Sequence, residues 1–298
     1  MCGIVGLFIK NPALEQSLGE HIAAMLMEMS ERGPDSAGAA VYRNEVAANK
    51  LKLTLQSGGQ SDWTDFQQKL AAKFGSAVEV EPLLNHAVVT VSATLNEVQA
   101  WLATDFPGMR INSSGHKIEI FKEKGAPSDF INNFQVNQYT GTHALGHTRM
   151  ATESAVTTEH SHPFSTGDDL CLVHNGSLSN HNRLRENLRA HGITFQTDND
   201  SEVAAGYLSW RLQEGDGLDD ALHHAIEDLD GFYTFAIGTR EGFAVLRDPI
   251  GCKPAIMAET DDWAAMSSEF RAIAQLPGVD KAKIWEPEPA RIYSWQRS

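Results

Sequence analysis

The alternation of apolar and polar residues predicts a mixture of strands and helices from the start of the chain. Residues 3–10 form a continuous apolar run, which is typical of a strand buried on both faces. Apolar residues between positions 18 and 29 then recur with the spacing of one helical face. This pattern ends near Gly33 and Pro34, because glycine favours a helix end and proline cannot continue a helix. Residues 39–43 follow as a second predicted strand.

The stretch from about residue 57 to 140 has a different pattern. A helical periodicity at 63–74 leads to a β-rich run at 86–93, a helix near 95–102 and two alternating strands. We expect this block to be a small α+β insertion, because closing a longer loop costs little additional entropy. Its residues form no pattern that indicates chemistry, which favours a structural or partner-facing role.

Short apolar runs return after this block. They predict strands within 142–152 and 169–177, helices near 180–190 and 201–213, and a hairpin within 231–251. Strands and helices occur in mixed order with adjacent hairpins, so the pattern favours α+β layers over a repeated βαβ unit. A chain of 298 residues is long enough to bury a full core without metal or disulfide cross-links.

Charge and cysteine content exclude several classes of protein. The 39 acidic and 24 basic side chains give a net charge of −15, which disfavours nonspecific binding to nucleic acid or to an anionic membrane. Cys2, Cys171 and Cys252 lack the paired spacing of a disulfide framework or a zinc site. The first apolar run is too short, and lacks the basic flank, for a signal peptide or a membrane span. We therefore expect a cytoplasmic protein.

Cys2 directly follows the initiator methionine. Removal of Met1 would leave a thiol and a free α-amine on one residue. An α-amine has a pKa of about 7.7–8.0, so a fraction is neutral at neutral pH and can take the thiol proton, directly or through one water. A cysteine at position two also arises by chance, so this interpretation depends on residues further along the chain.

Four later clusters carry many polar residues within strand-like or turn-like surroundings. Their candidate functional residues are Arg32 and Gly33; Arg149, Thr152 and His162; Asn175 and Gly176; and Asp198 and Asp200. Asn175 and Gly176 are also a common hairpin signal. Several histidines lie nearby, but the helical ligand spacing of His143 and His147 falls on a strand-like segment, so we expect no metal site.

Together with Cys2, these clusters resemble the class II glutamine amidotransferases, the N-terminal-nucleophile (Ntn) glutaminase domains of glutamate synthase, glucosamine-6-phosphate synthase and amidophosphoribosyltransferase. The matching motifs are CGIVG, RGPDSAG, GHTRMAT, HNG and DSEV, in the family's order, and RDPIGCKP resembles its closing hairpin. The resemblance implies an α+β fold, a four-layer αββα Ntn-hydrolase sandwich of antiparallel sheets over residues 2–298. The block at about 57–140 would interrupt this sandwich as a small α+β insertion.

The resemblance also implies catalytic roles. Cys2 would attack the side-chain amide of glutamine and form a γ-glutamyl thioester, which water then cleaves. The side-chain amide of Asn175 and the backbone N–H of Gly176 would form the oxyanion hole, where one donor typically contributes a factor of about 10²–10³ in rate. Arg32 would support the nucleophile.

Free glutamine is a zwitterion, so its site needs a cation and an acceptor. By the resemblance, Arg149 binds the α-carboxylate, which a guanidinium can hold with two parallel hydrogen bonds. Asp198 and Asp200 compete for the α-ammonium group, and the family pattern selects Asp200, which precedes Ser-Glu; Asp200 could also cap the following helix. Three further substrate contacts are implied at Gly33, Thr152 and His162.

Ammonia is useful only where an acceptor is close. About 44 residues follow Pro254, too few for a synthase domain, so we expect a hetero-oligomer in which synthase subunits accept the ammonia. The alternative is that the chain acts alone as a glutaminase. The resemblance points to glutamate-synthase-like systems, including N-methylglutamate synthase. The chain shows neither a dinucleotide fingerprint nor a cysteine cluster, so we expect no cofactor on it. The resemblance implies FMN on partner subunits, and it leaves open whether they also carry an iron–sulfur cluster.

Two other functions stay open. One is an N-terminal-cysteine amidase that acts on another amide, which would not need both Arg149 and Asp200. The other is a non-catalytic regulatory subunit of such a complex, favoured if Met1 is retained, because a peptide bond on the nitrogen of Cys2 would remove the base.

Overall fold

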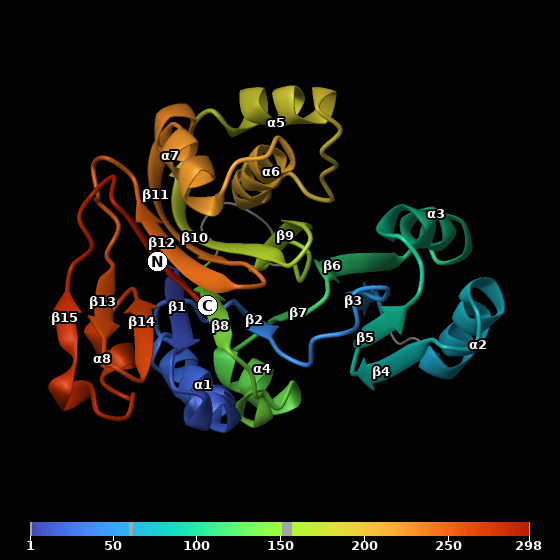
Figure 1. Cartoon of the computed structure of the whole chain (residues 1–298), viewed down its shortest axis with the longest axis horizontal. Helices are drawn as coiled ribbons and strands as arrows, with labels where there is room; N and C mark the ends of the chain where they lie inside the picture. Colours follow the sequence, from blue (N-terminus) through green and yellow to red (C-terminus); the bar gives the residue numbers. More distant parts are fainter. Residues whose placement is uncertain (1, 60–61, 151–156, 298) are drawn as a thin grey trace.

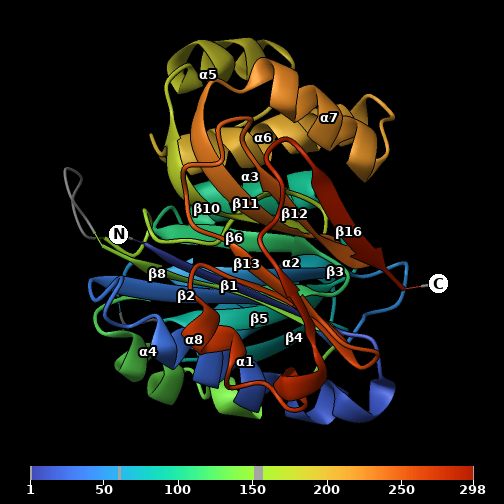
Figure 2. The same cartoon turned by 90° about the vertical axis from the view of Figure 1, so that its left-hand side faces the viewer.

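The computed structural model describes residues 2–59, 62–150 and 157–297. Two antiparallel sheets stack face to face, and helices cover their outer faces (Figures 1 and 2). The first sheet has seven described strands in the order β15-β13-β14-β1-β8-β2-β7. These are β1 (Gly3–Ile9), β2 (Ser36–Tyr42), β7 (Ile118–Lys124), β8 (His143–Arg149), β13 (Ile256–Glu259), β14 (Trp263–Ser267) and β15 (Lys283–Trp285).

The second sheet has five described strands in the order β16-β12-β11-β10-β9. They are β9 (Phe164–Gly167), β10 (Leu170–Leu178), β11 (Gly231–Gly238), β12 (Gly242–Arg247) and β16 (Ile292–Gln296). Helices α5 (His181–Ala190), α6 (Asp200–Gln213) and α7 (Leu218–Asp228) cover its outer face (Figure 1). The outer face of the first sheet is covered by α1 (Leu18–Glu28), α4 (Pro127–Asn133) and α8 (Phe270–Ile273), and short 3₁₀ turns lie at Pro12–Ser17, Val136–Gln138 and Val279–Lys281.

β1 lies in the middle of the sandwich and is buried on both faces, as its continuous apolar run predicts. Leu7 on one face belongs to the core cluster beneath α1, whereas Ile4 and Phe8 on the other face belong to the cluster between the sheets. The sheets approach so closely that a Cβ on Gly6 would lie 2.6 Å from a ring carbon of Phe243. The four-layer αββα architecture expected from the sequence is therefore observed.

A separate four-stranded sheet, in the order β4-β5-β3-β6, extends from the sandwich (Figure 1). It comprises β3 (Leu51–Ser57), β4 (Glu79–Leu83), β5 (His86–Val91) and β6 (Met109–Gly115), with α2 (Trp63–Phe74) and α3 (Leu95–Asp105) on one face. We call this the inserted unit. Its elements run from Leu51 to Gly115, whereas the sequence pattern suggested a block at about 57–140; β7 and α4, within that block, belong to the sandwich.

Buried charges and backbone contacts fix the inserted unit to the sandwich. Lys52 on β3 forms an ion pair with Glu119 on β7 at 2.6 Å, and both side chains are almost fully buried. Arg43, just after β2, pairs with the same carboxylate at 2.7 Å. The carboxylate of Asp169 accepts hydrogen bonds from the backbone N–H groups of residues 116, 117 and 118, at the junction between β6 and β7. The inserted unit is thus held at both ends.

We expect the buried His86 to make the protein sensitive to acid. The ring packs against Phe121 and Phe134, and burial lowers its pKa to about 3. An unfolded histidine has a pKa of about 6.5, so between pH 6.5 and 3 the unfolded chain binds the proton and stability falls as pH falls. In urea unfolding, the loss of stability from pH 7 to pH 5 should be about 2 kcal/mol smaller in His86→Phe than in the wild type.

His223→Phe, at an exposed position of α7, is the matched control. It should show the same pH dependence as the wild type. An equal loss of stability in His86→Phe and in the wild type would contradict the assignment of this proton to His86.

Candidate active site

Cys2 lies next to the first residue of β1, at one end of the two stacked sheets. Cys2 is partly buried, and its backbone carbonyl oxygen accepts two hydrogen bonds from side chains. Nε of Arg32 donates at 3.1 Å, and Nδ2 of Asn175, from the second sheet, donates at 3.4 Å. Arg32 and Asn175, which lie far apart in the sequence, therefore meet at the backbone of the predicted nucleophile.

A second contact fixes the guanidinium of Arg32. Its Nη1 forms an ion pair with Glu269 at 2.6 Å, and the hydrogen bond from Arg32 contributes most to lowering the pKa of that carboxyl group. Arg32 is thus held between the backbone of Cys2 and an acidic residue that follows β14. Sequence reasoning missed Glu269, because nothing local at that position connects it with the amino terminus.

Asn175 and Gly176 lie within β10, where they pair with Thr234 and Tyr233 of β11. The alternative that they form a hairpin turn is wrong. Gly176 has a φ of +149°, and a Cβ there would lie 1.8 Å from the carbonyl oxygen of Phe232, so this position requires glycine. Asn175 itself is buried and directed at the carbonyl oxygen of Cys2.

Arg149 is the last residue of β8 and is buried. The preceding Thr148 pairs with Gly3, so Arg149 and Cys2 lie at matching ends of neighbouring strands. Gly33 packs against this end of β8, where a Cβ would lie 2.2 Å from the carbonyl carbon of Thr148 and 2.4 Å from the nitrogen of Arg149. The structure therefore explains Gly33 by close backbone packing beside Arg149.

Asp200 is the first residue of α6, and its side chain is partly exposed. Its Oδ2 accepts a hydrogen bond at 2.8 Å from the backbone N–H of Leu178, two residues beyond Gly176. The helix cap is Asn199, whose side chain accepts from the backbone of α6, so the alternative that Asp200 is the cap is wrong. The side chain of Asp198 is 86% exposed and pairs with His160 at 2.8 Å. Of the two aspartates, Asp200 is the one next to β10, the strand that carries Asn175 and Gly176.

His162 belongs to a buried group of polar side chains beside Asp200. The hydroxyl of Ser201 lies 2.8 Å from Nε2 of His162 and 2.9 Å from Nδ1 of His174. His162 stacks on His147 with ring centroids 4.0 Å apart, and Nε2 of His147 lies 3.1 Å from the carbonyl oxygen of His174. Burial lowers the pKa of His147 to about 3 and also lowers those of His162 and His174, so all three rings are neutral at neutral pH.

The motifs pointed to His162 but not to the role of Ser201 as a bridge between two imidazoles. Thr152, the remaining candidate, lies outside the described residues.

Within residues 2–59, 62–150 and 157–297, no group of three or more His, Cys, Asp or Glu side chains is arranged to hold a metal ion. The helices described in those ranges include none long and apolar enough to cross a membrane.

Comparisons with known proteins show the family to which the chain is similar. The sequence pattern of the glutamine amidotransferase domain matches residues 147–275. The glutamine amidotransferase-like protein GlxB of Rhizobium meliloti (strain 1021) is 52% identical over 297 residues, which is 99% of this chain and 98% of that protein. A putative glutamine amidotransferase of Methanothermobacter thermautotrophicus is 31% identical over 304 residues, covering 98% of this chain and 99% of its own length.

The fold has solved counterparts as well. Glutamine phosphoribosylpyrophosphate amidotransferase from B. subtilis superposes with a TM-score of 0.60 at 20% identity, over 99% of this chain and 49% of that one. The fold is thus that of the Ntn amidotransferases. With the full-length similarity to GlxB, this shows that the chain belongs to the class II glutamine amidotransferase family.

Proposed function

We propose that this protein hydrolyses L-glutamine to glutamate and ammonia, with Cys2 as its N-terminal nucleophile. The observation that carries the proposal is the pair of hydrogen bonds from Arg32 and Asn175 to the carbonyl oxygen of Cys2. The bond from Asn175 fixes Cys2 to the strand that carries Gly176, and the pairing of Gly3 with Thr148 places Cys2 beside the end of β8 that carries Arg149. A nucleophile fixed between an oxyanion hole and a carboxylate-binding arginine is what hydrolysis of a zwitterionic amide requires.

In this proposal the two ends of the glutamine molecule are bound by opposite charges. Arg149, buried at the end of β8, binds the α-carboxylate with parallel hydrogen bonds. Asp200 binds the α-ammonium group through the carboxylate oxygens that face the end of β10. Gly33 and His162 shape the surroundings of these two groups, since one packs against the backbone of Arg149 and the other contacts Ser201 beside Asp200.

The proposed reaction begins with removal of Met1, which frees the α-amine of Cys2. This amine takes the thiol proton as sulfur attacks the amide carbon, and the oxygen of the tetrahedral intermediate is stabilised by Nδ2 of Asn175 and the N–H of Gly176. The ammonium so formed returns the proton to the departing nitrogen, which leaves as ammonia. Water then attacks the γ-glutamyl thioester, and glutamate and the thiol are released.

We further propose that the ammonia is used by a synthase partner within a cytoplasmic hetero-oligomer. The partner would be of the glutamate-synthase or N-methylglutamate-synthase type. It would carry FMN, either alone or together with an iron–sulfur cluster. Support comes from the family membership and from the absence of a dinucleotide fingerprint in this sequence. Copurification from the native source is the experiment that identifies this partner.

The proposal can be tested with a glutamine analogue that carries an electrophilic diazoketone in place of the amide. We expect one analogue per chain, attached to Cys2 with loss of nitrogen, in protein from which mass spectrometry shows Met1 to be missing. Cys252 is exposed and could react nonspecifically, so Cys252→Ala is the control and should be labelled to the same extent. Retention of Met1, or labelling at a residue other than Cys2, would contradict the mechanism.

Arg149→Lys tests whether the substrate is glutamine, which has an α-carboxylate, or another amide. Lysine keeps the charge but cannot form two parallel hydrogen bonds with a carboxylate, so the KM for glutamine should rise by about ten- to a hundredfold. Steady-state kinetics measure this, and thermal unfolding serves as the folding control. An unchanged KM would place the carboxylate site elsewhere and favour an amidase that acts on another amide.

A further inference from the structure

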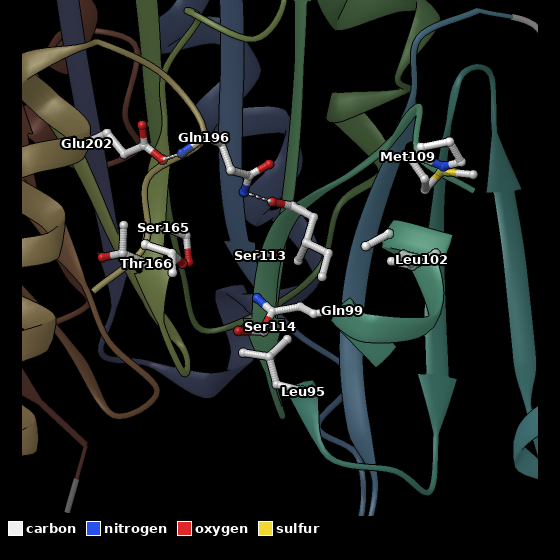
Figure 3. A pocket seen from close by; sticks show the side chains of 14 residues that line it. Leu95, Gln99, Leu102, Met109, Ser113, Ser114, Ser165, Thr166, Gln196 and Glu202 are labelled. Carbon is white, nitrogen blue, oxygen red and sulfur yellow. Dashed lines mark hydrogen bonds between the residues drawn. The ribbon is translucent and has the colours of Figure 1, made fainter. Parts of the chain in front are cut away.

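A cavity of about 430 Å³ lies between the inserted unit and the sandwich (Figure 3). Helix α3 and strand β6 form one wall, and β9 with the residues leading into α6 forms the other. Its volume is within the range of about 300–1,000 Å³ that small-molecule sites occupy. Neither Cys2 nor Arg149 nor Asn175 lines it, so it is distinct from the candidate active site.

The aliphatic side chains that line the cavity lie on one side. Leu95 and Leu102 project from α3, and Met109 and Ile111 come from β6 (Figure 3). The described lining residues include no aromatic side chain, so a flat aromatic ring would find no stacking partner there. We therefore expect this side to contact a saturated aliphatic part of a ligand.

The opposite side is polar but carries little charge. Hydroxyl and amide groups on this side come from Ser165, Thr166 and Gln196 (Figure 3). Gln99, Ser113 and Ser114 add polar groups to the wall formed by α3 and β6. The described lining residues include no lysine, arginine or histidine, so an anion would meet no cationic side chain among them and would lie beside the Glu202 carboxylate. The charged lining group is Glu202, whose carboxylate is already occupied by hydrogen bonds from within the protein.

These hydrogen bonds connect the cavity to the start of α6. The carboxylate of Glu202 accepts from the backbone N–H groups of Gln196 and Thr197 at 2.7 and 2.8 Å and from the Thr197 hydroxyl at 2.6 Å. The side-chain amide of Gln196 donates to the carbonyl oxygen of Ile111 on β6 at 2.9 Å, across the boundary between the two parts. An occupant of the cavity would therefore contact segment 194–202 directly.

We propose that this cavity binds a small amphipathic molecule without negative charge, whose aliphatic side faces α3 and β6 and whose hydroxyl or amide groups face β9 and segment 194–202. Binding then stabilises that segment, which ends in the first turn of α6. Because Asp200 lies in this turn, occupancy also changes the affinity for glutamine. Only this last consequence rests on the proposed function.

Three probes of equal chain length test the charge preference: hexane-1,6-diol, 6-aminohexan-1-ol and 6-hydroxyhexanoate. We expect the full chain to bind the diol and the amino alcohol, and to bind the carboxylate at least about tenfold more weakly, by titration calorimetry or ligand-observed NMR at pH 7. In hydrogen-exchange mass spectrometry, saturation with the diol should slow exchange in segment 194–202. Equal binding of all three probes, or no binding of the diol, would overturn the proposal.

Gln99→Trp places a large side chain in the cavity from an exposed position of α3, where the protein should tolerate it. Diol binding should weaken at least about tenfold, and the protection of segment 194–202 should disappear. Ala103→Phe, on the same wall, provides a second filling variant should the first fail to fold. Gln68→Trp makes the same chemical change at an exposed position of α2 that does not line the cavity, and it should bind the diol normally.

Unchanged diol binding in a folded filling variant, or equal loss in Gln68→Trp, would show that the probe binds elsewhere. Binding and exchange are measured without glutamine, so these results stand whether or not the chain proves to be a glutaminase. If the chain is a glutaminase, saturating diol should also shift the KM for glutamine in the wild type but not in Gln99→Trp. An unchanged KM in the wild type, or an equal shift in Gln99→Trp, would show that occupancy of the cavity does not affect glutamine binding.

Discussion

Cys2→Ala is expected to lower kcat for glutamine hydrolysis by at least about 10⁴-fold, because removal of a catalytic nucleophile leaves only binding and oxyanion stabilisation. The hydrogen bonds from Arg32 and Asn175 go to the backbone carbonyl of Cys2, so they do not need the thiol and the variant should fold normally. Alanine also permits removal of Met1, so the α-amine remains. Glutamate release and thermal unfolding are the two measurements.

The other cysteines provide the comparison for this variant. Cys252→Ala removes an exposed thiol and should retain wild-type kcat, whereas Cys171 is fully buried between the sheets and is best left unchanged. Turnover in Cys2→Ala at the rate of Cys252→Ala would exclude Cys2 as the nucleophile. Loss of activity in both variants would show that the assay reports general damage to the protein.

The sequence predicted best those parts of the fold that depend on local periodicity. β1 and α1 follow from an apolar run and from a helical spacing within fewer than thirty residues. β3 was not predicted, although its leucines alternate with Lys52 and Thr54 as in a strand with one exposed face. The alternation also suggests that Lys52 and Thr54 are exposed, which is wrong. Both are buried, Lys52 against Glu119 and Thr54 beside Ser113, and neither partner can be found from sequence spacing alone.

The candidate site likewise contains residues that motifs predict and residues that only the folded structure reveals. Cys2, Arg32 and Asn175 were found through motifs, and the structure brings all three together. Glu269 and Ser201 were missed because their roles arise from contacts with Arg32 and with two buried histidines, which only the folded chain creates. The cavity beside α3 could not be predicted for the same reason, since its walls come from three separated stretches of sequence.

Asn175→Ala is expected to lower kcat by about 10²–10³-fold, while KM for glutamine stays within a few-fold of the wild type. Its Nδ2 now contacts the carbonyl oxygen of Cys2 at 3.4 Å, and an amide has a second N–H that can be directed at the oxyanion. This second donor acts only after sulfur has attacked, so its loss affects the transition state more than the bound substrate.

A matched control separates this effect from a general one. Asn187→Ala removes an exposed amide from α5 and should leave kcat and KM unchanged. Gly176 keeps its backbone N–H in Asn175→Ala, so residual turnover should remain well above that of Cys2→Ala. A rise in KM with unchanged kcat would instead mean that Asn175 binds the substrate in its ground state, and the oxyanion hole would have to be formed by other donors.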